Sequence, residues 1–238
     1  MRSTYWQIAA VLAIAILVDS CAVTRQPVPV PATAAVQATY PSDLQGAQLF
    51  RINPTASIVH ILVYRGGTMA HMGHNHVISS TSLSGYLWQH ASPEGSGFNI
   101  VIPVNELIVD DDHTRAEEGA EFPLNVNEEA RQGTRSNMLS EVLLDGEHFP
   151  FITIKSIRIG GATNALQVTA ALQIKQQTRE VTVPVAIEVH GHQLAARGEF
   201  DIRQSDFGMV PFSVAMGALN VLDTVKIRFD LVASHIEP

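Results

Sequence analysis

The stretch ALQVTAALQIKQQTREVTVPVAIEVH (165–190) decides the fold, because it contains two adjacent segments typical of β-strands. The first segment is ALQVTAALQI (165–174), and apolar and polar residues alternate in its part QVTAALQI (167–174). The second segment, EVTVPVAIEVH (180–190), is also strand-like. Alternation places successive side chains on opposite faces of a strand, whereas a helix repeats its apolar positions about every 3.6 residues. The stretch therefore predicts two consecutive strands, each with one face turned toward a core.

Six further segments show the strand pattern, and short turn signals separate several of them. The turn signals are SPEGSG (92–97), IGGATN (159–164) and VHGHQ (189–193). Eight short strands at hairpin spacing predict a mainly β protein, built as an antiparallel barrel or sandwich. The six further segments are SIVHILVY (57–64), VISSTSLSGYLW (77–88), GFNIVIPV (97–104), FITIKSIRI (151–159), LAARGEFDIR (194–203) and TVKIRFDLVAS (224–234).

The middle of the sequence, residues 105–146, loses this two-residue period. Its second half carries apolar residues at helical spacing, and Gly146 follows them as a stop signal. We expect one or two short helices inserted between strands, where they would cap or plug one end of a barrel. The apolar residues at helical spacing are Met138, Leu139, Val142 and Leu143.

The N-terminal residues 1–20 predict a signal peptide. Arg2 supplies a positive charge, and Ile8 to Val18 is an unbroken run of eleven apolar residues. Such a run is too short to cross a bilayer core of about 30 Å as a helix, but it fits the hydrophobic region of a secretory signal. We therefore expect an exported protein.

The single cysteine follows this signal within LVDSC (17–21), which resembles the bacterial lipobox. One cysteine cannot form an internal disulfide, and lipidation of Cys21 would account for it. Asp19 fits the lipobox poorly, so an ordinary secretory signal is the alternative. Ala22 is not the aspartate that resembles an inner-membrane retention signal. The expected location is the periplasmic side of the outer membrane, with the lipid anchor as the membrane contact.

The next stretch, TRQPVPVPATAAVQATYPSD (24–43), is rich in proline, alanine and small polar residues. Such a composition buries little, so residues 21–43 are interpreted as the lipidated cysteine and a tether. The globular domain then covers residues 44–238, enough for one domain with a substantial core. The formal net charge of −8 argues against nucleic acid as a partner.

Three parts of the domain resemble the YceI-like family in their order and spacing. They are GTRSNMLSEVLLDGEHFPFITIKS (133–156), LQIKQQTREVTVPV (172–185) and FDIRQSDFGM (200–209) with DTVKIRFDLVA (223–233). Residues 105–132 are longer than the usual connection, and Met138 replaces a histidine that is usual in the helix. The chain therefore resembles a divergent member of this family.

The resemblance implies a lipocalin-like antiparallel barrel of about eight strands that holds a long isoprenoid chain. It also implies a binding or carrier protein without catalytic activity, for a ligand such as a quinone or a prenyl alcohol. Independently, the domain is rich in aliphatic residues, and a barrel of this size can hold one small ligand. Candidate ligand-binding residues are Tyr86, Trp88, Arg135, Met138, Leu139, Phe149, Phe151, Phe207 and Phe212.

Arginines supply a further candidate contact, because a guanidinium can form two hydrogen bonds to a phosphate or one to a quinone oxygen. Arg115, Arg131 and Arg135 are the candidates, and Arg135 is preferred because it lies in the family-like segment. An ordinary surface salt bridge is the alternative. The same region includes VDDDHTR (109–115), in which an aspartate is expected to cap the following turn.

A histidine cluster, AHMGHNH (70–76), suggests a second function. On a strand, His74 and His76 would share one face, and His71 could fold back toward them from the preceding loop. Imidazoles suit zinc or copper, and neighbouring methionines would favour copper(I). The alternative is that the histidines solvate the mouth of the barrel or contact a ligand headgroup. The candidate metal ligands are His71, His74, His76, Asp112 and His113.

Patterns of nucleophilic catalysis and phosphate binding are absent from the sequence. It has no Gly-x-Ser-x-Gly elbow, and RGG (65–67) and IGG (159–161) lack the spacing of a phosphate loop. We therefore expect no catalytic residues. An interaction protein with a filled barrel remains a third hypothesis, and the sequence leaves open whether two chains pair.

Overall fold

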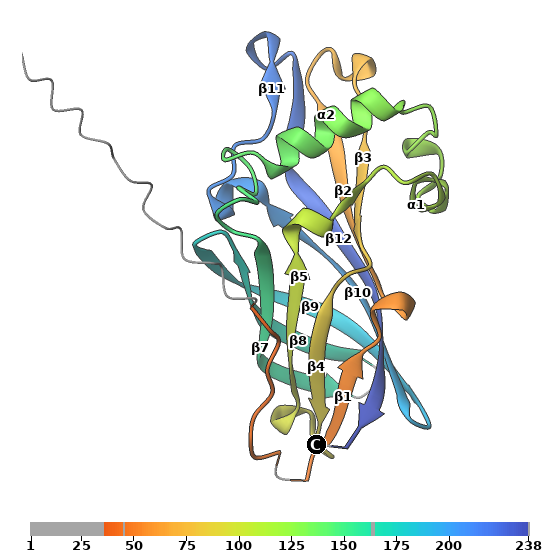
Figure 1. Ribbon diagram of the computed structural model, residues 1–238, viewed down its shortest axis with the longest axis vertical. Coiled ribbons are helices and arrows are strands. Elements are labelled where there is room, and N and C mark those ends of the chain that lie inside the picture. The colour runs from red at the N-terminus through yellow and green to blue at the C-terminus, as the bar shows by residue number, and fades with distance from the viewer. Residues whose placement is uncertain (1–35, 45, 163–164, 238) are drawn as a thin grey trace, which may run out of the picture. The chain divides into compact units, whose positions relative to one another are not determined.

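The computed structural model describes residues 36–237, except for 45, 163 and 164. The predicted signal peptide, the lipidated cysteine and most of the predicted tether lie outside these residues. In the described part, strands form a barrel (Figure 1). Two helices lie between strands β6 (Ile108–Val109) and β7 (Phe151–Ala162). Neither of these two helices is long and apolar enough to span a bilayer.

Eight antiparallel strands close the barrel, in the order β1-β4-β5-β7-β8-β9-β10-β12, and β12 pairs with β1. The closed ring leaves no free edge among these strands, as expected for a lipocalin-like barrel. The prediction of an antiparallel barrel is thus confirmed. The eight strands are β1 (Gln48–Ile52), β4 (Ser84–Gln89), β5 (Gly97–Pro103), β7 (Phe151–Ala162), β8 (Ala165–Ile174), β9 (Gln177–His190), β10 (Gln193–Arg203) and β12 (Leu219–Ile236).

Strand β8 shows why the sequence folds in this way. Every second residue is buried, while most of the intervening residues are exposed or half-buried. The two-residue period of the sequence therefore becomes one apolar face toward the barrel interior. The buried apolar residues of this strand are Leu166, Val168, Ala170, Leu172 and Ile174.

The same sheet continues from β12 beyond the barrel at one end, through β2 (Ile58–Gly66), β3 (His76–Ser80) and β6 (Ile108–Val109). Strand β12 is long enough to pair with β1 near its C-terminal end and with β2 over its first part. The two-residue strand β11 (Ser213–Val214) pairs with the start of β12. The barrel interior therefore continues beyond the closed ring at this end.

The prediction of one continuous strand over residues 77–88 is wrong. The chain leaves β3, which pairs with β2 and β6, and enters β4, which pairs with β1 and β5. This change of partners requires a break between Ser80 and Ser84. Leu83 lies within the break, and its side chain is buried in the core.

The predicted helical insertion is present as α1 (Asp112–Glu117) and α2 (Glu128–Leu139). Asp111 caps α1 by accepting hydrogen bonds from the amides of His113 and Thr114, at 3.1 and 3.2 Å. The predicted capping aspartate is therefore confirmed. Asn127 caps α2 in the same manner, with its side-chain oxygen 2.9 Å from the Ala130 amide.

The predicted continuation of this helix toward Gly146 is wrong, because α2 ends at Leu139. Ser140 adopts an extended conformation, and its hydroxyl donates to the carbonyl of Asn137 at 2.6 Å. This local bond competes with continuation of the helix. The chain then turns, so that Leu143 faces the interior while Val142 is exposed.

Candidate ligand-binding cavity

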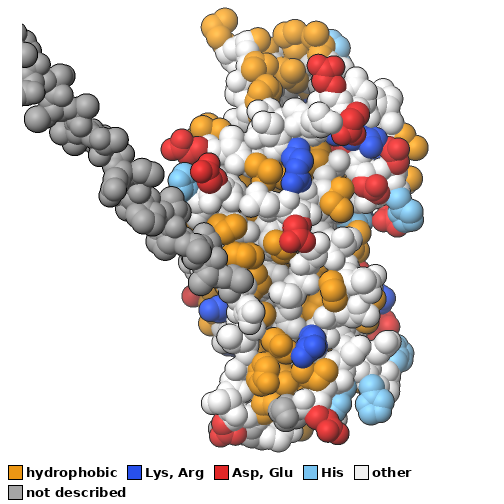
Figure 2. Space-filling view, viewed as in Figure 1, with side chains coloured by type: hydrophobic (Ala, Val, Ile, Leu, Met, Phe, Trp, Pro, Cys, Tyr) orange, Lys and Arg blue, Asp and Glu red, His pale blue; other side chains and the backbone are white. Residues whose placement is uncertain are grey.

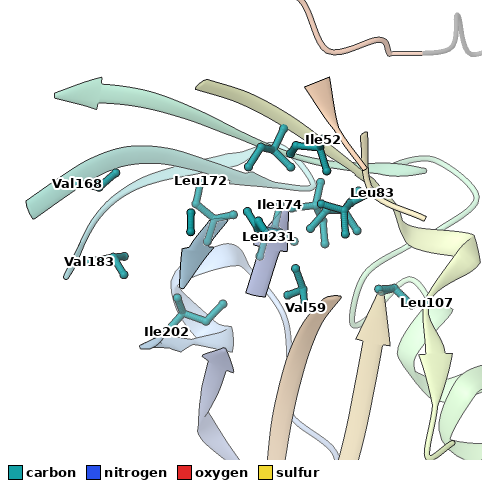
Figure 3. Packing of buried hydrophobic residues seen from close by; sticks show 14 of the residues in the cluster. Ile52, Val59, Leu83, Leu107, Val168, Leu172, Ile174, Val183, Ile202 and Leu231 are labelled. Carbon is teal, nitrogen blue, oxygen red and sulfur yellow. The ribbon is translucent and has the colours of Figure 1, made fainter. Parts of the chain in front are cut away.

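The barrel encloses a cavity of about 550 Å³. Its wall consists almost entirely of aliphatic side chains from the inward faces of the strands. Figure 3 shows such side chains from several strands converging on one interior, among them Leu172, Ile174 and Leu231. Close-packed protein interiors rarely contain voids larger than a water molecule. A cavity of this size is within the range of small-molecule sites and is too large for a fully packed core.

Helix α2 covers one end of the cavity with a single face. Ala130, Gly133, Thr134, Asn137 and Met138 line the cavity. They share one helix face, because each has another of the five three or four positions away. Most of these side chains are small or polar, unlike those of the strands. This end of the cavity therefore offers polar groups, whereas its middle does not.

The turn between β4 and β5 forms the opposite end. Trp88 lines the cavity there, and it is paired with Gly97 on the neighbouring strand. A Cβ atom at position 97 would overlap the indole ring, so glycine leaves the space that the ring occupies. His90 and Ser96 add polar groups at this end.

A buried ionic network reaches the cavity wall through His76. The Nδ1 atom of His76 lies 2.6 Å from Oδ2 of Asp110, and His76 lines the cavity. The other carboxylate oxygen accepts hydrogen bonds from the Val77 amide, at 2.9 Å, and from Arg115. Both side chains of the Asp110–Arg115 ion pair are fully buried.

Arg115 is held by backbone carbonyls as well as by Asp110. It donates to the carbonyl of Asn75 at 2.9 Å, and to that of Pro123 at 2.9 and 2.7 Å. Its guanidinium also lies 6.0 Å from the ring centre of Phe122. The network therefore joins β3, β6, α1 and the segment after α1.

Burial alone would raise the pKa of Asp110. The hydrogen bond and charge of His76, together with the Val77 amide and Arg115, outweigh burial and lower the pKa below its ordinary value. The carboxylate is thus ionised in the folded protein. Because its pKa is lower in the folded state, the ionised Asp110 stabilises the fold at pH values above the unfolded-state pKa. This stabilisation is lost as the pH falls through the folded-state pKa.

Three of the nine candidate ligand-binding residues line the cavity, namely Trp88, Met138 and Phe212. Trp88 lies at the β4–β5 end, Met138 is on α2, and Phe212 precedes β11. Phe212 is also partly exposed to solvent. These three come from segments that are far apart in the sequence, and the barrel brings them to one interior.

The other six candidates do not line the cavity. Tyr86 packs against Tyr40, with ring centres 4.8 Å apart. Phe207 and Leu139 belong to the packed core around the cavity. Phe149 and Phe151 flank the start of β7 and are half-buried.

The three candidate arginines all have partners within the protein. Arg135 donates to the carbonyls of Asn105 and Leu107 and so fastens α2 to the segment after β5. Arg131 pairs with Asp112 on α1. Arg115 is the buried partner of Asp110 described above, so none of the three faces the cavity.

The structure does not bring the five candidate metal ligands together. Strand β3 begins at His76, so His74 lies outside the strand, and the two ring centres are 6.5 Å apart. Asp112 pairs with Arg131, and His113 lies 3.3 Å from Glu117. His71 is exposed in the β2–β3 connection. Within residues 36–237 as described, no group of three or more His, Cys, Asp or Glu side chains is arranged to hold a metal ion.

Residues before Leu44, which the sequence predicts to be a tether, contact the barrel. Asn99 donates a side-chain hydrogen bond to the carbonyl of Thr39 at 3.1 Å, and Tyr40 packs on Tyr86. Tyr40 in an otherwise small and polar stretch is the one sequence signal for such a contact. These residues lie on the outer wall and take no part in the cavity.

A closed eight-stranded antiparallel barrel with an apolar interior cavity belongs to the lipocalin-like class of barrels. Within this class, a sequence model of the YceI-like domain matches residues 50–233. The match covers more than half of the chain, and the protein therefore belongs to the YceI-like family. A search of curated proteins finds no significant match.

Several solved structures are similar to this chain, and one with a TM-score above 0.5 supports the fold. BcnA of Burkholderia cenocepacia is similar with a TM-score of 0.58 and 21% sequence identity, over 77% of this chain and 99% of BcnA. The YceI protein of Campylobacter jejuni gives a TM-score of 0.48 and 11% identity, over 66% of this chain and 82% of its own. At these identities the similarity concerns the fold alone.

Proposed function

We propose that this protein binds and carries an amphiphile with a long isoprenoid or similar lipid tail inside its barrel, without catalysing a reaction. The observation that carries this proposal is the apolar cavity of about 550 Å³. The YceI-like family, generally one of binding and carrier proteins, agrees with a hydrophobic ligand. Each buried methylene of a tail would contribute about 0.8 kcal/mol to binding.

The ends of the cavity differ from its middle in a way that suits an amphiphile. The strand walls offer an apolar tail little besides aliphatic side chains, whereas polar groups occur at both ends. His76 and Thr134 stand at the α2 end, and His90 stands at the opposite end. A ligand with one polar end and a long tail fits this distribution, with its tail along the aliphatic middle and its polar end at one end of the cavity.

The proposed location follows from the sequence. Export by the signal in residues 1–20 and lipidation of Cys21 would place the barrel on the periplasmic side of the outer membrane. A carrier there would sequester or deliver a membrane lipid. The metal-binding alternative would use His71, His74 and His76, and it requires these side chains to rearrange from the positions described above.

Native mass spectrometry of the full-length protein, purified from the bacterial envelope, tests the proposal. We expect an added mass that is released on denaturation and partitions into organic solvent. Reloading the stripped protein with a prenyl alcohol should restore a one-to-one adduct. A stoichiometric metal ion would favour the alternative, and a protein without any adduct that also fails to reload would contradict the carrier function.

A further inference from the structure

The hydrogen-bonding state of His76 follows from its partner. Asp110 is ionised, and a carboxylate only accepts hydrogen bonds, so the Nδ1 atom of His76 carries the hydrogen of the 2.6 Å bond. In the neutral ring, Nε2 is then unprotonated and accepts a hydrogen bond. Nε2 is the remaining polar atom of the His76 side chain, and His76 lines the cavity.

The network behind His76 fixes the ring in this orientation. Asp110 has a positive φ of 55°, which is uncommon for a residue other than glycine. Arg115 and the Val77 amide hold the carboxylate in place. A buried charge pair of this kind is costly unless it is well paired. Its position directly behind a cavity-lining histidine points to a role in ligand recognition.

We infer that His76 recognises the polar end of the ligand and that this end carries a hydroxyl group, as in a prenyl alcohol or a hydroquinone. The inference rests on the proposed function, because it assigns the polar end of the same ligand. A hydroxyl suits Nε2 in either charge state of the ring, because it donates to Nε2 of the neutral ring and accepts from Nε2–H of the charged ring. An ester or a quinone carbonyl offers no hydrogen and can only accept. Thr134 and Asn137 lie at the same end of the cavity, because α2 packs against β6 and β6 pairs with β3.

Two substitutions of His76 separate its two nitrogen atoms. His76→Asn keeps a donor near the position of Nδ1, and thus the bond to Asp110, but removes Nε2. His76→Gln places an amide near Nε2 and gives up the bond to Asp110. For the wild-type protein we expect a prenyl alcohol to bind roughly tenfold more tightly than the hydrocarbon that lacks its hydroxyl. His76→Asn should abolish this preference, and His76→Gln should restore part of it.

Titration of the stripped full-length protein, followed by tryptophan fluorescence, measures both affinities, because Trp88 in the cavity wall responds to the ligand. Melting temperatures establish that each variant is folded. An unchanged tenfold preference in His76→Asn would overturn the role of His76. Equal affinity of the wild-type protein for both molecules would overturn the assignment of a hydroxyl group to the polar end of the ligand. If the wild-type protein binds neither molecule, the proposed function fails as well.

A second inference concerns an exposed apolar surface, which we call the apolar tip. It is formed by the β2–β3 connection and by the segment around β11, and hydrophobic side chains gather there at the top of Figure 2. The Met69 amide donates to the Ala218 carbonyl at 2.7 Å, and Gly66 pairs with Asn220, so the two segments form one surface. The exposed residues of the apolar tip are Met69, Met72, Val210, Phe212, Val214, Met216 and Leu222.

The apolar tip lacks charge in a protein that is otherwise acidic. Residues 66–76 and 207–222 contain no Asp, Glu, Lys or Arg, although the chain has a net charge of −8. Arg65, at the base, donates to the carbonyl of Gly73. Ala215 and Met216 both have positive φ angles, of 50° and 54°, and Met216 is fully exposed. An exposed apolar patch presented at this conformational cost marks an interaction site.

We propose that the apolar tip contacts the lipid bilayer, where the cavity takes up or releases its ligand. Phe212 connects the two features, because it belongs to the apolar tip and also lines the cavity. An uncharged surface is not repelled by a membrane, and flexible methionine side chains adapt to disordered lipid. This inference also rests on the proposed function, since a lipid carrier must meet its membrane.

A fluorescent probe at two positions tests the contact without depending on the N-terminal anchor. In full-length protein with Cys21→Ser, an environment-sensitive fluorophore is attached through Met216→Cys or, as the control, through Val189→Cys. Val189 is exposed and pairs with Leu194 on β10, which in turn pairs with Ala233 near the C-terminal end of β12. Strand β11 pairs with the first residues of β12, so the control position lies far from the apolar tip. Phosphatidylcholine vesicles should shift the emission to shorter wavelengths for the probe at position 216 only. Added salt should not reverse the shift, because no charged residue belongs to the apolar tip.

Equal shifts at both positions, or none at position 216, would overturn the membrane contact. A shift that disappears in salt would also overturn it, because the contact would then be electrostatic. The result is separable from the proposed function. If the protein loads a prenyl alcohol but the probe at position 216 shows no emission shift, the carrier function would stand and only the membrane contact of the apolar tip would be rejected.

Discussion

Replacing Arg115 with methionine is expected to lower the free energy of unfolding by about 3–5 kcal/mol. The substitution leaves the Asp110 carboxylate fully buried, with His76 and the Val77 amide as its remaining partners. It also leaves the carbonyls of Asn75 and Pro123 without the hydrogen bonds that Arg115 donates. Urea denaturation followed by circular dichroism measures the loss.

Arg131→Met is the matched control, because Arg131 also pairs with an aspartate of the helical insertion, but near the surface. Its partner Asp112 is 67% exposed, and an exposed ion pair contributes less than about 1 kcal/mol. Asp110→Asn in the Arg115→Met background removes the uncompensated charge and should recover part of the loss, since asparagine tolerates the positive φ at position 110. Similar small losses for Arg115→Met and Arg131→Met would contradict a structural role for the buried pair.

The strand pattern was readable from the sequence because one face of each barrel strand is buried. In β8 the alternation of apolar residues in 165–174 matches the strand to its ends. Strand β1 was missed, since Gln48–Ile52 is short and its pairing with both β4 and β12 depends on residues far along the chain. The break at Leu83 was missed for the same reason: a change of strand partner has no local signal.

The candidate site was only partly predictable, because its polar network depends on long-range contacts. His76 and Asp110 are 34 positions apart, and the pairing of β3 with β6 brings them together. The sequence placed both in candidate clusters but suggested metal ligation for His76 and its neighbours. Four of the six aromatic candidates do not line the cavity, whereas Trp88 and Phe212 do. Aliphatic side chains fill the strand faces that line the cavity, whereas Tyr86 and Phe207 pack elsewhere.

Filling the cavity is expected to have the largest effect on ligand binding, and Ala170→Trp is the substitution of choice. Ala170 is buried on β8, lines the cavity and offers the smallest side chain among its neighbours on this face of the strand. An indole at this position would occupy space that a lipid tail needs. Excluding about four methylenes costs the ligand about 3 kcal/mol, which corresponds to a roughly hundredfold weaker affinity.

The adjacent residue provides the control. Ala171 is half-buried and does not line the cavity, and its partners in the sheet are Lys155 and Glu180. Ala171→Trp therefore adds the same side chain to the outer face of the same strand, and its ligand affinity should remain that of the wild-type protein. Native mass spectrometry of both variants measures ligand occupancy, and titration with a prenyl alcohol measures affinity.

Stability distinguishes a blocked cavity from a damaged barrel. In a fully packed core, an inserted indole forces neighbouring side chains and backbone to move, which typically costs 1–3 kcal/mol or more. In an open cavity, the indole gains apolar burial without displacing protein atoms, so Ala170→Trp should unfold at a urea concentration close to that of the wild-type protein. Loss of ligand with retained stability would support the cavity as the binding site. Equal ligand loading of Ala170→Trp and Ala171→Trp would place the ligand elsewhere, and a large loss of stability in Ala170→Trp alone would indicate a filled interior.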